Sequence, residues 1–331
     1  MRRDRSPYGP DVDLTAITHR PVARNGITLH VAEAGPPDGP VVLLLHGFPE
    51  CWYSWRHQLV GLAAAGFRVL APDQRGYGRS SAPADVAEYT VLHLVGDAVA
   101  VLDDAGADRA VVVGHDWGAP VAWHTALLRP DRVAGVVGLS VPHLPRTDDP
   151  PTGRMARRYG RAYYQLHFQT PGAADAELAA DPRRSFRRIL TGAPAGDGLL
   201  VPPGGGFLDV LREPATPPAW LTEADLDVYV AEYAEHGFTG GLNWYRNLDR
   251  NWALTAAWHG VPVGVPARYL AGDRDMVIAG VPADALAATL ARSCSDLRGV
   301  DLLPGCGHWT QQERPDEVTD AVRAFAADSL A

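Results

Sequence analysis

The stretch Ala110-Val-Val-Val-Gly114-His-Asp116-Trp-Gly118-Ala119 decides the fold, because it joins an apolar strand to a helix through a turn of small residues. Residues 110–113 predict a buried strand, and residues 117–128 are compatible with a helix. Between them stands Gly-x-Asp-x-Gly. This is the layout of a nucleophile elbow, in which small residues flank a side chain held on a sharp strand-to-helix turn. Serine is the usual apex residue, and the chain contains no Gly-x-Ser-x-Gly.

An aspartate at the apex of such a turn changes the reaction class. A carboxylate can displace a leaving group from saturated carbon, which gives an alkyl-enzyme ester that water then hydrolyses. Epoxides and alkyl halides fit this chemistry, whereas peptide cleavage fits it poorly. Taken alone, Asp116 could also merely cap the helix that follows it. The residues expected beside Asp116 distinguish these two interpretations.

Strand-like and helix-like segments alternate on both sides of this turn. Strands are predicted at two segments joined by Asn25-Gly26 within 17–32, and at 41–45, 67–72, 110–113, 133–141, 267–271 and 300–303. Helices are predicted at 52–65, 91–105, 117–128, 282–293 and 315–330. This alternation predicts an α/β fold, with a mostly parallel sheet and helices on both faces.

The alternation stops between about Pro142 and Trp258. The features of this segment are arginine-rich helical candidates within 153–168, a Pro/Gly-rich loop at 192–206 and an acidic helix at 223–236. We therefore expect a core made of residues 1–143 and 259–331, with a helical cap of residues 144–258 inserted into it. Because ligands bind at the carboxyl ends of the strands in such sheets, the cap would enclose a pocket.

The composition argues against several function classes. The chain has 331 residues, a formal net charge of −9 and no lysine. The charge disfavours nucleic acid or an anionic membrane as a partner, and the lack of lysine excludes Schiff-base chemistry and the lysine-bearing phosphate loop. Cys51, Cys294 and Cys306 lack the spacing of a disulfide framework or a metal site. No signal-length or bilayer-length apolar run is found, so we expect a cytoplasmic protein without metal or organic cofactor.

Two partners for Asp116 are expected at the carboxyl ends of later strands. His308, in Gly305-Cys-Gly-His308-Trp309, follows the strand at 300–303 and would be the base that activates water. Asp273 and Asp275 both follow the strand at 267–271. Asp275 is preferred as the acid that orients the histidine and stabilises its imidazolium form, although sequence position hardly separates the two.

Two backbone N–H groups are candidates for an oxyanion hole. The N–H groups of Phe48 and Trp117 would receive the oxyanion that forms as water attacks the ester. Phe48 stands in His46-Gly-Phe-Pro-Glu50, so a turn dictated by glycine and proline is the structural alternative. Both interpretations can hold, since a rigid turn aims the N–H group.

With these residues, the chain resembles the epoxide hydrolases of the α/β-hydrolase fold over nearly its whole length. The motifs that carry the resemblance are His46-Gly-Phe-Pro-Glu50, Asp73-Gln-Arg-Gly-Tyr-Gly-Arg-Ser80, Gly114-His-Asp-Trp-Gly118 and Gly307-His-Trp-Thr310. The family carries two cap tyrosines that hold and protonate the epoxide oxygen. The matching residues are Tyr164, which precedes Gln165, and Tyr245. The family's usual segment has an aromatic residue where His167 stands here.

The resemblance implies that an epoxide and water are converted to a vicinal diol. From the whole sequence we expect a monomer or homodimer with no nucleic acid or membrane partner. The resemblance also implies that Glu50 helps to hold the hydrolytic water near His308; a solvated turn acid is the alternative. Further candidates to line the substrate and water site are His46, Trp52, Gln165, Trp244 and Trp309, with aromatic packing as the default role of the tryptophans.

Two rival functions stay open. A haloalkane dehalogenase would use the same aspartate nucleophile, but halide leaves without a proton, so paired phenols would be unnecessary. A non-catalytic protein of the same fold that binds a small molecule or a partner protein would not need a nucleophile, base, acid and oxyanion donors together.

Overall fold

The computed structural model describes residues 12–194 and 198–331. Its main feature is one eight-stranded sheet with the order β1-β2-β4-β3-β5-β6-β9-β10. The strands are β1 (Thr18–Arg24), β2 (Ile27–Ala34), β3 (Val41–Leu45), β4 (Arg68–Pro72), β5 (Ala110–His115), β6 (Val133–Leu139), β9 (Val263–Gly272) and β10 (Cys294–Leu303). β2 is antiparallel to β1 and β4, and every other neighbouring pair is parallel. The predicted α/β class is therefore confirmed.

Local sequence explains the central strands and the first turn. Asn25 and Gly26 both have positive φ, 51° and 77°, as a two-residue hairpin turn requires. Every residue of β3, β5 and β6 is buried. Strands covered on both faces have no solvent side, so they appear in the sequence as continuous apolar runs.

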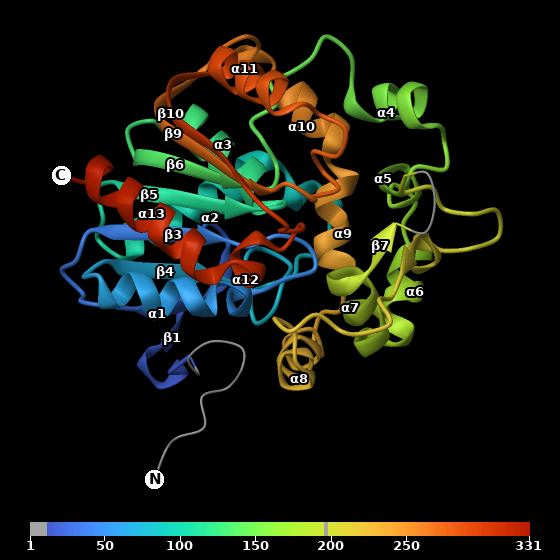
Figure 1. Ribbon diagram of the computed structural model, residues 1–331, viewed down its shortest axis with the longest axis horizontal. Coiled ribbons are helices and arrows are strands. Elements are labelled where there is room, and N and C mark those ends of the chain that lie inside the picture. Colours follow the sequence, from blue (N-terminus) through green and yellow to red (C-terminus); the bar gives the residue numbers. More distant parts are fainter. Residues whose placement is uncertain (1–11, 195–197) are drawn as a thin grey trace.

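Helices cover both faces of the sheet (Figure 1). In that view α1 (Arg56–Ala64) and α13 (Pro315–Ser329) lie in front of the sheet, and α2 (Val91–Asp104) and α3 (Gly118–Leu128) lie behind it. α11 (Ala283–Ser293) packs against β10. The remaining short helices outside residues 144–258 are η1 (Leu14–Ala16), η2 (Trp52–Trp55), η3 (Val86–Tyr89) and α12 (Thr310–Glu313). Within the described residues, no helix is both long enough and apolar enough to cross a membrane.

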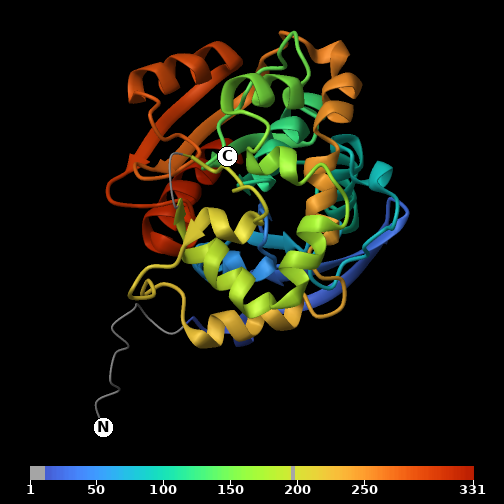
Figure 2. The ribbon, with the colours of Figure 1, turned by 90° about the vertical axis from the view of Figure 1, so that its right-hand side faces the viewer.

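Between β6 and β9 the chain forms a separate group of helices, to the right of the sheet in Figure 1 and facing the viewer in Figure 2. They are α4 (Pro151–Tyr159), α5 (Tyr164–His167), α6 (Ala173–Ala180), α7 (Pro182–Thr191), η4 (Phe207–Val210), α8 (Glu223–Glu232), α9 (Thr239–Arg246), α10 (Leu248–Leu254) and η5 (Ala256–Trp258). Two-residue strands β7 (Ala193–Pro194) and β8 (Leu211–Arg212) pair with each other. The helical candidates expected at 153–168 are two helices, α4 and α5, because Gly160 (φ 87°) ends α4.

Backbone packs directly on backbone where α9 meets the core. A Cβ added at Gly240 would lie 2.2 Å from the carbonyl oxygen of Gly76. Beside this contact the Trp244 indole donates to the carbonyl oxygen of Arg75 at 3.1 Å. On α8, the Glu232 carboxylate accepts hydrogen bonds from Arg79. The inserted helices α8 and α9 therefore pack against the loop 73–80 of the core.

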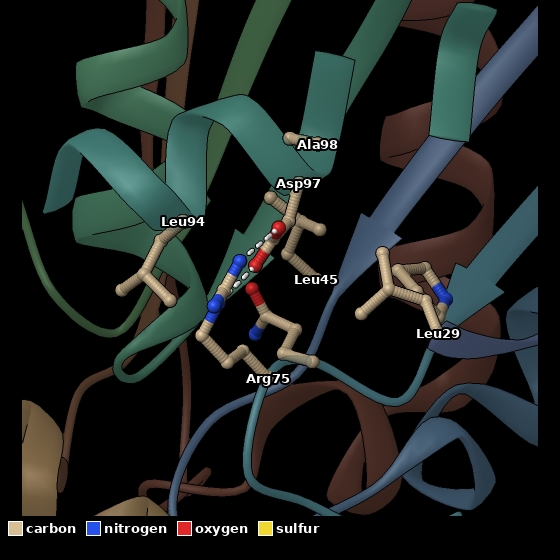
Figure 3. Close-up of a pocket in the computed structure, with 8 residues that line it drawn as sticks. Leu29, Leu45, Arg75, Leu94, Asp97 and Ala98 are labelled. Atoms are coloured by element: carbon tan, nitrogen blue, oxygen red, sulfur yellow. Dashed lines mark hydrogen bonds and ion pairs between the residues drawn. The ribbon is translucent and has the colours of Figure 1, made fainter. Parts of the chain in front are cut away.

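An ion pair holds the same loop from beneath (Figure 3). The Arg75 guanidinium binds both carboxylate oxygens of Asp97 on α2 at 2.8 Å. Next to the pair lies a cavity of about 10 Å³, bounded by Leu29 and Leu45 among others, which has room for about one water molecule. Because both charged groups are almost fully buried and bidentate, the pair fixes the direction of the loop.

Candidate active site

The turn after β5 has the geometry that its glycines predict. Asp116 has a φ of +48°, which is rare for a residue with a side chain. A Cβ at Gly114 would lie 2.1 Å from the carbonyl oxygen of Gly118, and a Cβ at Gly118 would lie 2.0 Å from the carbonyl oxygen of Leu45. Only glycine fits at both positions, and the turn between them lifts the carboxylate above the ends of β3 and β5.

Two features hold the Asp116 carboxylate. The N–H of Phe48 donates to its Oδ1 at 2.8 Å, and Trp117 is the N-cap of α3, whose positive end favours a negative charge. A Cβ at Gly47 would lie 2.4 Å from the Asp116 Cβ, so the loop after β3 packs closely against the Asp116 side chain. Of the two expected oxyanion donors, the Phe48 N–H therefore contacts the carboxylate directly, and Trp117 follows Asp116 in the chain at the start of α3.

The histidine and one of the two candidate acids meet Asp116. His308 Nε2 lies 3.5 Å from Asp116 Oδ2, and His308 Nδ1 lies 3.0 Å from Asp275 Oδ1. Asp275 is fully buried, and its Oδ1 also accepts from the N–H of Val277. Asp273 is exposed and accepts from the N–H of Gly305, so it is a loop residue away from the histidine.

Charge coupling sets the protonation of these three groups. Burial alone would lower the pKa of His308, but the carboxylates of Asp275 and Asp116 raise it well above its ordinary value. Burial would likewise raise the pKa of Asp116 and of Asp275, but the hydrogen bond and positive charge of His308 lower both. An ionised carboxylate is therefore available as a nucleophile, next to an imidazolium that keeps it ionised.

A fourth polar residue touches this group and was not predicted from the sequence. Ser140, which follows β6 directly, is fully buried, and its Oγ lies 2.9 Å from His308 Nδ1. Its φ is +69°. The one available signal was its place at the carboxyl end of a central strand, which it shares with the residues of the predicted set.

The two predicted tyrosines lie on helices of the inserted segment. Tyr245, on α9, is buried, with its ring centroid 4.9 Å from that of Trp117 and 5.6 Å from that of Phe48. The Tyr164 ring on α5 lies 6.3 Å from the Tyr245 ring. Gln165 donates to the Tyr164 hydroxyl at 2.9 Å. Burial raises the pKa of both phenols well above 10, so both stay protonated.

Glu50 is not a solvated turn acid, and that alternative is wrong. Its side chain is fully buried, and its Oε1 accepts from the side-chain amides of Gln311 and Gln312, both at 2.9 Å. Its Oε2 lies 2.8 Å from Nδ1 of His115, whose Nε2 lies 2.8 Å from the carbonyl oxygen of His308. Glu50 thus reaches His308 through His115 and makes no direct contact with the imidazole.

The other predicted lining residues make different contacts around Asp116 and His308. Trp309 packs on the His308 ring at 4.7 Å, and Trp244 packs on Trp117 at 6.0 Å. His46 is fully buried, with Nδ1 bound to the Gly47 carbonyl and Nε2 to the Gln74 N–H, so neither nitrogen is free for a substrate.

Two further expectations concern Trp52 and metals. Trp52 packs on His19 and His30, and its indole donates to Glu232. These contacts give it a role in the packing between core and inserted helices. Within residues 12–194 and 198–331, no group of three or more His, Cys, Asp or Glu side chains is arranged to hold a metal ion.

Comparison with known proteins points to one group. Residues 40–194 match the family model described as alpha/beta hydrolase fold. Epoxide hydrolase A of Mycobacterium tuberculosis is 51% identical over 317 residues, which cover 94% of this chain and 97% of that protein. The crystal structure of epoxide hydrolase A from Mycobacterium thermoresistibile has a TM-score of 0.88 at 47% identity, covering 94% of this chain and 98% of the other. An epoxide hydrolase from Vigna radiata has a TM-score of 0.89 at 40% identity, covering 96% and 99%.

Proposed function

This chain belongs to the epoxide hydrolases of the α/β-hydrolase fold, and from that premise we propose that it converts an epoxide and water to a vicinal diol through an ester on Asp116. The observation that carries the proposal is a base 3.5 Å from the Asp116 carboxylate, together with two buried, protonated tyrosines that are near enough for the charge of Asp116 to act on them. Each comes from a different part of the chain: His308 after β10, Tyr164 from α5 and Tyr245 from α9.

In the first step, Asp116 attacks an epoxide carbon from the side opposite to the breaking C–O bond. The alkoxide that forms is a poor leaving group, and the hydroxyls of Tyr164 and Tyr245 hydrogen-bond to it and supply a proton. Support comes from the raised pKa of both phenols, since a phenol that remains protonated can donate. The product of this step is a hydroxyalkyl ester of Asp116.

In the second step, His308 removes a proton from water, which attacks the carbonyl carbon of the ester. Once Asp116 is esterified it carries no charge, so one of the two carboxylates that raise the pKa of His308 is lost. The pKa of the imidazole then falls, and its neutral form becomes accessible as a base. Asp275 stabilises the imidazolium that results, and the N–H groups of Phe48 and Trp117 receive the oxyanion.

We further infer that residues 144–258 act as the cap of this site. The support is that both phenols lie on helices inserted between β6 and β9, whereas the nucleophile, base and acid follow strands of the sheet. A substrate held between the two groups would be shielded from bulk water, which strengthens hydrogen bonds to the developing alkoxide.

Trapping the ester tests the covalent route. Replacing His308 by glutamine removes the base but leaves the nucleophile, so incubation with styrene oxide should add one substrate mass to a peptide that contains Asp116. Asp116→Asn in the same background should abolish the adduct and serves as the control. No mass increase in the His308→Gln protein, while the unaltered protein forms diol, would refute the covalent mechanism.

The two phenols separate this function from dehalogenation. Tyr164→Phe combined with Tyr245→Phe should abolish diol formation from styrene oxide, because the alkoxide then lacks a proton donor. Halide leaves without a proton, so release of bromide from a bromoalkane that survives the double substitution would favour a haloalkane dehalogenase instead.

A further inference from the structure

Ser140 is held in a conformation that a serine rarely adopts. Its φ of +69° places a buried side chain in the left-handed region, which disfavours every residue with a Cβ except in special contexts. Apart from Ser140, the non-glycine residues with positive φ in the described part of the chain are Asn25, in a hairpin turn, and Asp116, the nucleophile. Such outliers persist only where surrounding contacts enforce them, and they are concentrated at functional sites.

Strand β9 enforces this conformation. The Ser140 N–H donates to the carbonyl oxygen of Leu270 at 2.9 Å, and the hydroxyl of Tyr269 donates to the Ser140 carbonyl oxygen at 2.6 Å. Tyr269 and Leu270 lie on β9, just before the loop that carries Asp275. The backbone of Ser140 and the catalytic acid are therefore fixed to the same strand.

The result of this arrangement is that the Ser140 hydroxyl points at the acid–base pair. Its Oγ lies 2.9 Å from His308 Nδ1, which is as close as Asp275 Oδ1 at 3.0 Å. The other carboxylate oxygen of Asp275, Oδ2, is buried without a hydrogen-bond partner among the described residues. A hydroxyl rotates freely, so it can accept from Nδ1–H and donate to a carboxylate at the same time.

From this geometry we propose that Ser140 is a positioning residue for His308: its hydroxyl bridges Nδ1 of the imidazole and the carboxylate of Asp275. The bridge holds the proton on Nδ1, so that the Nε2 lone pair faces Asp116 and the water that attacks its ester. The inference rests on the proposed function, and it assigns the effect to the second half-reaction, in which His308 is the base.

Burial opposes the ionisation of Asp275, and interaction with the Ser140 hydroxyl is among the contacts that lower the pKa of that carboxyl. The charged groups that face His308 are Asp116 and Asp275, and the ring of His115 lies 5.0 Å away. In the ester Asp116 is neutral, so Asp275 and the Ser140 hydroxyl become the main stabilisers of the imidazolium. Loss of the hydroxyl should then lower the pKa of His308 in the ester.

Two substitutions separate the hydroxyl from the backbone strain. Ser140→Ala removes the hydroxyl and keeps the strained Cβ, whereas Ser140→Gly removes both and relieves the conformational cost. In each, single-turnover reaction with styrene oxide is followed by Trp fluorescence and by mass spectrometry of quenched samples, which resolve ester formation from ester hydrolysis. Ser185→Ala is the matched control, a buried serine of the cap whose Oγ bonds to the carbonyl oxygen of Leu178.

We expect hydrolysis of the ester to slow by roughly 10- to 100-fold in both Ser140 variants, which is the range for losing a hydrogen bond to a charged group. Ester formation should change by less than about threefold, because the Asp116 carboxylate is untouched. The acid limb of the hydrolysis rate should also move to lower pH, since the imidazolium is less stable. Ser185→Ala should show neither change.

Three results would overturn the proposal. One is unchanged hydrolysis with an unshifted pH profile in both variants. Another is recovery of the parent rate in Ser140→Gly, which would assign the effect of Ser140→Ala to strain. The third is an equal fall of both half-reactions together with the melting temperature, which would make the role structural. If the unaltered protein formed no ester at all, the proposed function would fail as well, so the two failures are distinguishable.

Discussion

Replacing Gly47 by alanine would place a methyl group in steric conflict with the side chain of Asp116. The added Cβ would lie 2.4 Å from the Asp116 Cβ and 2.5 Å from its Oδ1, whereas ordinary contact begins at 3.4 Å. Asp116 or the loop after β3 must therefore move by about 1 Å, and a displacement of about 1 Å costs about 100-fold in rate when reacting atoms must align. The N–H of Phe48, which follows Gly47 and binds Oδ1, would move as well.

We expect ester formation from styrene oxide to fall by about 100-fold in Gly47→Ala, measured by single-turnover kinetics. The unfolding free energy should fall by about 1–3 kcal/mol, the usual cost of forcing a methyl group into a packed site. The protein should remain folded at room temperature, so the kinetic loss can be measured separately.

Gly264→Ala makes the same chemical change at an open site, because nothing lies within 4 Å of a Cβ at this position of β9. Its ester formation should match that of the parent, and its stability should stay within about 0.5 kcal/mol. If Gly47→Ala kept a rate of ester formation within a factor of about three of the parent, the carboxylate would not be held as tightly as these contacts imply.

Three further outcomes test other contacts. Because the pKa of Asp116 lies below its ordinary 3.8, ester formation should stay level as the pH falls toward that value and be lost only below it, as single-turnover rates in acidic buffers would reveal. Arg79→Ala leaves the buried Glu232 carboxylate with the Trp52 indole, so urea unfolding should reveal a loss of about 1–3 kcal/mol. Glu50→Gln places an amide opposite the donating amides of Gln311 and Gln312, and the unfolding free energy in urea should fall by about 2 kcal/mol or more. Glu50→Asp keeps the carboxylate and should lose less of the unfolding free energy.

The elbow was predictable from sequence because its requirements are local. Gly114 and Gly118 are dictated by backbone contacts within a few residues of Asp116 and by one contact to β3. The central strands were predictable for a similar reason, since burial on both faces leaves a continuous apolar run. The expected starts of β9 and β10 were several residues too late, because in each strand a buried first residue is followed by an exposed one, so the early residues form no continuous apolar run.

Features that depend on distant partners were not predictable. Asp273 and Asp275 are two residues apart, and the backbone turn after β9 decides that Asp275 faces His308. Glu50 is buried because Gln311 and Gln312 are brought to it from the other end of the chain.

The sequence predicted a helical insertion but not the bounds of most of its short helices. On α7, the buried residues Ser185, Phe186, Ile189 and Leu190 have helical spacing, but pairs of arginines interrupt the apolar pattern. Those arginines bind acids on α8, for example Arg183 and Arg187 to Glu223. The pattern is therefore that of a helix with one narrow buried face, which short sequence windows detect poorly.

The contact between Gly76 and Gly240 has a consequence for the range of substrates. Since α9 rests on the core with no side chain between the two backbones, the distance from the Tyr245 hydroxyl to the Asp116 carboxylate is set by that backbone contact. A larger residue at 240 would push α9 away from the core and so increase the distance between Tyr245, the proposed proton donor, and Asp116, the proposed nucleophile. Under the proposed function, room for bulkier epoxides is therefore better sought by changes on α5, the other helix that carries a tyrosine of the site.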